Sequence, residues 1–251
     1  MKAWEILLPA AGVIGWSLYR QWRTQRKTIV MPVTEPSIEI DGTPDVPVAF
    51  GYKVAWLAID ADDSQFVCRS LGIADTEVAN WQSGVAAAHR GHVFVTPPVR
   101  GWVLLVSSSF PRLASFEDAE SSHRWLEQVG KHFTRLCYFA TDRVTEYHAW
   151  AQLTSGTVVR AFAYVGDSGE ILENFGQPTA EELSFGLPII GAPPGSVEAV
   201  ETVDGQLEMP AVPDEEHVIE LARMWTINPL ELPKVAPSPT TGWLSRTWPA
   251  A

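Results

Sequence analysis

The strongest candidate for acid–base chemistry in this chain is a carboxylate and an imidazole two residues apart. Glu146 and His148 fall in a segment whose apolar pattern predicts a strand over Thr145–Leu153. Because strand side chains alternate between two faces, Glu146, His148 and Trp150 are expected to share one face. Such a pair can act as general base and general acid. Strand alternation produces this spacing often without any chemistry, so a hydrolase-like enzyme is one hypothesis among several.

The other polar residues predict less chemistry. His89 and His92 flank an expected turn, where no carboxylate or cysteine close in sequence completes a metal site, although such a site stays an alternative. Asp60, Asp62 and Asp63 follow an expected strand, and capping of the next helix explains them. The chain has no GxSxG, GxGxxG, Walker, HExxH or EF-hand motif. We therefore expect no catalytic activity, no metal and no cofactor.

The acidic residues are distributed unevenly along the chain. The 251 residues have a net charge of −12, and residues 1–30 carry a net +4, which leaves −16 for the rest. Between Arg160 and Arg223 there is no lysine or arginine, whereas thirteen aspartates and glutamates occur. A surface of one sign repels nucleic acid and anionic lipid and attracts basic proteins. We therefore do not expect direct binding of nucleic acid. We expect a partner protein with a basic surface instead.

The expected contact surface is the acidic loop that leads into the last helix. Its seven carboxylates are Glu198, Glu201, Asp204, Glu208, Asp214, Glu215 and Glu216. The expected last helix, Asp214–Trp225, starts with three consecutive carboxylates, which suits the positive end of the helix dipole. The alternative is that these carboxylates only solvate a loop.

Residues 1–27 are expected to form a membrane-associated helix. Residues 6–19 carry no charge, aromatic residues flank them, and a basic segment follows. This run is shorter than the roughly 20 residues that a membrane span needs, although residues 4–22 together come near the lower limit. The positive flank places the body on the cytoplasmic side of the inner membrane. A helix buried in the fold or lying in the membrane interface is the alternative.

The pattern downstream predicts an α+β domain over residues 49–232, with a linker at 28–48 before it and a proline-rich tail at 233–251 after it. A mostly antiparallel sheet covered by helices is expected. The expected strands are Phe50–Ile59, Val93–Thr96, Trp102–Ser107, Cys137–Thr141, Thr145–Leu153, Thr157–Tyr164 and Glu170–Asn174. The expected helices are one ending near Leu71, then Thr76–His89, Phe116–Leu136, Pro178–Phe185 and Asp214–Trp225. The two cysteines, Cys68 and Cys137, are expected to be buried free thiols.

Five segments carry a resemblance to known proteins: FGYKVAWLAI (50–59), HVFVTPPVRGWVLLV (92–106), CYFATDRVTEYHAWAQL (137–153), RAFAYVGDSGEILENFG (160–176) and PDEEHVIELARMWTINPLEL (213–232). As a set they resemble bacterial immunity proteins encoded beside secreted polymorphic toxins, including type VI secretion effectors. The resemblance covers roughly residues 50–232. It implies an inhibitor that binds one cognate toxin, and it transfers no contact residues.

The leading hypothesis is therefore an immunity protein that neutralises a secreted antibacterial toxin by stoichiometric, charge-complementary binding. A nuclease toxin suits this hypothesis because its substrate groove must be basic. Two alternatives stay open. One is the hydrolase-like enzyme that uses Glu146 and His148. The other is a membrane-anchored adaptor or effector chaperone, which should expose a large apolar groove.

Overall fold

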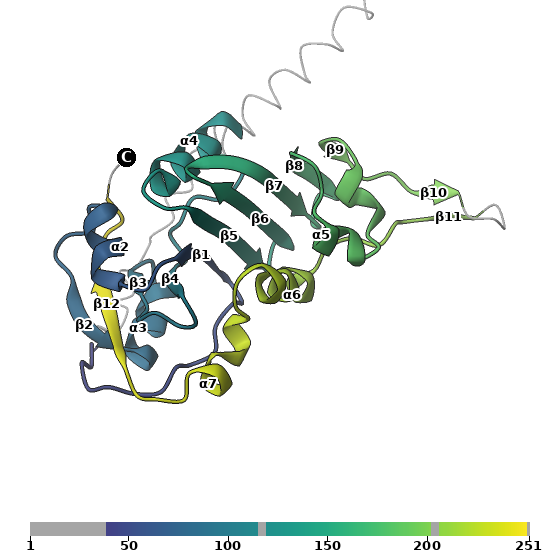
Figure 1. Ribbon diagram of the computed structural model, residues 1–251. Helices are drawn as coiled ribbons and strands as arrows, with labels where there is room; N and C mark the ends of the chain where they lie inside the picture. Colours follow the sequence, from purple (N-terminus) through teal and green to yellow (C-terminus); the bar gives the residue numbers. More distant parts are fainter. Residues whose placement is uncertain (1–38, 115–118, 202–205, 250–251) are drawn as a thin grey trace, which may run out of the picture. The chain divides into compact units, whose positions relative to one another are not determined.

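The computed structural model describes residues 39–114, 119–201 and 206–249. One sheet forms the centre of this part of the chain (Figure 1). From edge to edge, its ten strands are β2 (Glu77–Asn80), β12 (Thr241–Ser245), β3 (Val93–Val95), β4 (Trp102–Ser107), β1 (Val54–Asp60), β5 (Arg135–Asp142), β6 (Tyr147–Thr154), β7 (Thr157–Val165), β8 (Glu170–Phe175) and β9 (Gly195–Ser196). Every neighbouring pair is antiparallel.

Helices cover both faces of the sheet, so the central strands are apolar at almost every position. In β1, Trp56 and Ala58 belong to the core on one face, while Leu57 and Ile59 belong to the core on the other. The first core also contains side chains of α3 (Trp81–Ala88) and α6 (Glu215–Trp225). The second contains side chains of α2 (Ser64–Ser70) and α4 (Ala119–Gly130). The expected α+β class, with an antiparallel sheet covered by helices, is confirmed.

The membrane-associated helix expected at residues 1–27 lies outside the described residues. In the three described ranges, no helix is both long enough and apolar enough to cross a bilayer.

Several local predictions are confirmed. Asp63 caps α2, since its carboxylate accepts a hydrogen bond from the Gln65 backbone N–H at 2.8 Å. The hairpin of β3 and β4 is present, and Val95 pairs with Leu105. Both cysteines are buried free thiols.

The helix predicted over Thr76–His89 is wrong in its first part. The chain forms β2 there, and α3 begins only after it, at Trp81. Strand β2 exists because it pairs with β12 from the other end of the chain. Asn80 then caps α3 by accepting a hydrogen bond from the Ser83 N–H at 2.9 Å. Local periodicity contains no information about the distant strand.

The helix predicted over Phe116–Leu136 ends earlier than expected. Helix α4 stops at Gly130, and β5 begins at Arg135, which pairs with Thr154. A Cβ atom on Gly130 would lie 2.8 Å from a Leu153 methyl carbon, so the helix end packs tightly against the β6–β7 hairpin. Residues 115–118 lie outside the described ranges.

The proline-rich segment at 233–251 is expected as a tail, yet part of it lies inside the sheet. Strand β12 sits between β2 and β3. A Cβ atom on Gly242 would lie 2.3 Å from the Val95 carbonyl oxygen, so the strand needs glycine there. Residues 39–48 of the expected linker also join the fold, because the Asp45 carboxylate accepts the Trp81 N–H at 2.7 Å.

We predict that Leu244→Ala lowers the free energy of unfolding by about 2–5 kcal/mol, because Leu244 is 1% exposed in the first core. The control is Pro237→Ala, which changes an exposed residue of the same proline-rich segment and should cost less than about 0.5 kcal/mol. Urea denaturation measures both. If β12 were a loosely attached tail, both variants would leave the free energy of unfolding nearly unchanged.

Candidate functional site

The candidate acid–base pair and three of the seven predicted interface carboxylates line one open pocket of about 440 Å³. We call it the acidic pocket. It is lined by Arg143, Glu146, His148, Val212, Pro213, Asp214, Glu215 and Glu216. These residues come from the turn before β6, from β6 itself, and from the segment that leads into α6 together with the first residues of that helix. The sequence did not predict this meeting, since the two groups were candidates for different functions.

The start of α6 contributes the acidic wall of this pocket. Asp214 caps the helix, and its carboxylate accepts the His217 backbone N–H at 3.0 Å. The pKa of Asp214 is lowered: burial alone would raise it, but hydrogen bonds and the nearby His217 outweigh burial. Asp214 and Glu216 are exposed, and Glu215 is partly buried. These three positions of the predicted interface therefore lie together.

His148 forms the buried side of the acidic pocket. It lies in β6 and is 4% exposed, and its Nδ1 is 3.0 Å from the Thr141 hydroxyl oxygen. Burial lowers the pKa of His148 to about 4, against a smaller opposing effect of Asp214. The imidazole is therefore uncharged near neutral pH and adds no positive charge to the pocket.

Glu146 does not lie in the strand, so the prediction that it alternates with His148 along β6 is wrong. It is an exposed residue of the preceding turn, with a φ of 49°. The Glu146 carbonyl accepts the Gly166 N–H at 3.0 Å, which ties this turn to the β7–β8 turn. Glu146 and His148 still line one pocket, although Glu146 lies in the turn and only His148 lies in the strand.

One cation partly neutralises the pocket. Arg143 makes two hydrogen bonds to the Glu215 carboxylate, at 2.9 and 3.2 Å, and its guanidinium also lies 5.1 Å from the centre of the Tyr52 ring. Across the described ranges, no group of three or more His, Cys, Asp or Glu side chains is placed to hold a metal ion. The chemistry that this arrangement favours is binding of positive charge.

The rest of the predicted interface lies on an arm. Strands β10 (Val200–Glu201) and β11 (Leu207–Glu208) form a separate two-stranded sheet, which extends away beyond β9 and α5 (Figure 1). We call residues 198–201 and 206–209 the acidic arm. Glu198 and Glu208 are exposed, as predicted for contact residues. Asp204 and the side chain of Glu201 lie outside what the structure describes.

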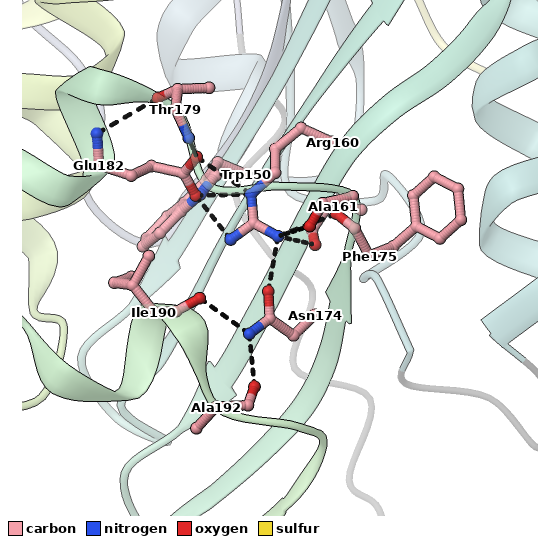
Figure 2. A network of polar contacts seen from close by, with 10 residues as sticks. Trp150, Arg160, Ala161, Asn174, Phe175, Thr179, Glu182, Ile190 and Ala192 are labelled. Atoms are coloured by element: carbon pink, nitrogen blue, oxygen red, sulfur yellow. Dashed lines mark hydrogen bonds and ion pairs between the residues drawn. The ribbon is translucent and has the colours of Figure 1, made fainter.

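Two carboxylates of the acidic stretch are structural, a role that was not predicted for them. Figure 2 shows Glu182 of α5 (Ala180–Ser184) with Arg160 of β7, which are 0% and 1% exposed. The Arg160 Nε donates to both Glu182 oxygens, at 2.8 and 3.0 Å, and Trp150 Nε1 donates to Glu182 at 2.7 Å. The spacing of Thr179 and Glu182, a capping box, was the available sequence signal.

The second structural carboxylate is Glu173 in β8. It is 4% exposed and pairs with His123 of α4. The hydrogen bond that the His123 Nε2 donates to this carboxylate raises the pKa of His123. The thirteen acidic residues are thus not one continuous surface, because two of them hold helices against the sheet.

Arg160 also fixes the root of the acidic arm. Its Nη1 donates to the Asn174 side-chain oxygen at 2.5 Å (Figure 2). The Asn174 amide in turn donates to the carbonyls of Ile190 at 2.8 Å and Ala192 at 2.5 Å. These carbonyls belong to η1 (Pro188–Gly191) and the residue after it. One buried guanidinium therefore sets the position from which the arm departs.

Comparisons with protein-family models, curated proteins and solved structures find no match to this chain. The resemblance to immunity proteins therefore stays a prediction. The geometry of the pocket and the arm is what supports a function.

We predict that Glu182→Ala lowers the free energy of unfolding by about 3–5 kcal/mol, because it leaves a buried guanidinium without its carboxylate. The control is Glu181→Ala in the same helical turn, where the side chain is only partly buried and the cost should stay below about 1 kcal/mol. Chemical denaturation gives both values. If both variants lost the same small amount of unfolding free energy, the Arg160–Glu182 pair would not contribute to stability.

We also predict that the free energy of unfolding falls at acid pH because His148 is buried in its neutral form. Its pKa moves from 6.5 to about 4 on folding, so unfolding takes up a proton between these pH values. The contribution of His148 is complete above pH 6.5 and is lost as the pH falls toward 4, by up to about 3 kcal/mol. Urea denaturation across this range measures it. The variant His148→Gln should show a correspondingly shallower dependence, and identical slopes would contradict the assignment.

Proposed function

We propose that this protein is a non-catalytic inhibitor that binds a basic partner protein through its acidic arm and acidic pocket. The observation that carries the proposal is the arm. Its exposed side chains include Leu207 and Met209, which are 74% and 59% exposed beside the carboxylates. A two-stranded ribbon is at best marginally stable alone in water. An arm that leaves apolar side chains in solvent is best explained by a partner that covers them.

Charge supports the same proposal. The stretch between Arg160 and Arg223 contains no lysine or arginine, and the buried imidazole of the acidic pocket is neutral. Complementary charge accelerates association and selects basic partners. We propose that the partner is a secreted antibacterial toxin of the nuclease type, whose basic substrate groove the acidic surface occupies. The resemblance to type VI immunity proteins is in accord with this.

The expected membrane association belongs to the same proposal. Residues 4–22 would tether the inhibitor at the cytoplasmic side of the inner membrane, where it meets an incoming toxin. This part of the proposal rests on the sequence alone, because these residues lie outside the described ranges.

An enzyme is the second candidate, since Glu146 and His148 line the same pocket. The two functions differ in stoichiometry. An inhibitor protects only when it is present in at least equal amount to the toxin. An enzyme protects at far lower amounts, and Glu146→Gln should then abolish protection.

The test uses the product of the gene adjacent to the one for this protein. We predict that reversing three exposed charges, with Glu198→Lys, Glu208→Lys and Glu216→Lys, weakens binding at least about tenfold and removes most of its salt dependence. Calorimetry at several salt concentrations measures the affinity, and co-expression measures the rescue of cell growth.

The matched control reverses three exposed acids elsewhere on the domain, Glu39, Asp62 and Glu77. It changes the net charge equally and should leave most of the affinity. Binding that ignores both salt and the position of the reversed charges would refute the electrostatic mechanism.

A further inference from the structure

An apolar groove of about 340 Å³ lies at the root of the acidic arm. Its base contains Ile171 of β8 and Ile189 of η1, which are 2% and 4% exposed. Four prolines also line it: Pro188, Pro193, Pro194 and Pro210. The groove is distinct from the acidic pocket, with which it shares no residue. It is too small for a membrane-spanning segment and suits one large side chain.

The groove is held in shape before any partner arrives. On one side, the Asn174 amide fixes the carbonyls of Ile190 and Ala192, and Arg160 fixes Asn174 (Figure 2). On the other side, β9 pairs with β8, and the Val197 N–H donates to the Gly169 carbonyl at 2.7 Å. The proline rings fix the backbone φ angle at their positions, which further limits movement of the groove wall. A preformed groove binds without the cost of ordering its walls.

The charge around the groove selects the occupant. Glu198 lines the groove and is exposed, and the exposed Glu208 follows on the arm. The residues that line the groove include no lysine or arginine, and none occurs in the sequence between Arg160 and Arg223. An apolar side chain with acidic neighbours would meet repulsion here, and one with basic neighbours would meet attraction.

We propose that the groove binds one large apolar side chain, aromatic or aliphatic, that is flanked by lysine or arginine in an exposed segment of the partner protein. This inference rests on the proposed function and adds the anchor to it. The carboxylates attract the partner, whereas burial of the anchor side chain slows its dissociation.

The experiment uses two fluorescein-labelled peptides, acetyl-Lys-Lys-Trp-Lys-Lys and acetyl-Lys-Lys-Ala-Lys-Lys, titrated with the full chain. We expect the tryptophan peptide to bind at least about tenfold more tightly, as an apolar anchor should. Ser196→Trp places a bulky side chain at the groove on an exposed position and should remove the difference between the peptides. Ser238→Trp, on an exposed loop elsewhere, should preserve it.

The outcomes separate the two proposals. Equal, salt-dependent affinities for both peptides would overturn the groove and leave the electrostatic function standing. A tryptophan preference that survives Ser196→Trp would place the apolar site elsewhere and also overturn the groove. Failure of both peptides to bind at low salt would overturn the groove together with the electrostatic mechanism.

Discussion

The guanidinium of Arg160 and the carboxylate of Glu182 lie fully out of solvent, and the proposed binding features depend on where this pair sits. Arg160 reaches α5 through Glu182 and reaches η1 through Asn174. Desolvation makes such a pair a weak source of net stability, and apolar residues often replace one without loss. Our hypothesis is that the pair is useful for specificity, because it permits only one attachment of α5 and the arm root to the sheet. A rigid root gives the arm and the groove a defined starting geometry.

The acidic stretch divides into carboxylates with different physical roles. Glu173 and Glu182 are buried and hold helices to the sheet, and Glu215 is paired with Arg143. The carboxylates of the arm face solvent instead, where their mutual repulsion costs folding free energy. That cost is small in water and at physiological salt, because exposed charges are well screened. A protein can therefore retain such a surface at little expense to stability when a basic partner uses it.

Much of the fold could be predicted from local pattern, and the failures have a common cause. The apolar run before Asp60 predicts β1 because a strand covered on both faces needs apolar side chains throughout. The segment from Thr76 was predicted to be helix, but its first part is a strand because it pairs with β12. The same holds for the candidate site. Its acidic residues could be identified from charge alone. Their position beside the buried His148, however, follows from the packing of α6 on β5 and β6.

The sequence by itself determined the apolar run of β1, the presence of a capping aspartate before α2 and the charge of the arm. Each of these depends on neighbours within a few residues. Only the tertiary structure decided that β12 enters the sheet and that Arg160 meets Glu182 and Asn174. Such contacts join distant segments, and their geometry follows from the free energy of the whole packed domain. No short stretch of sequence contains that information.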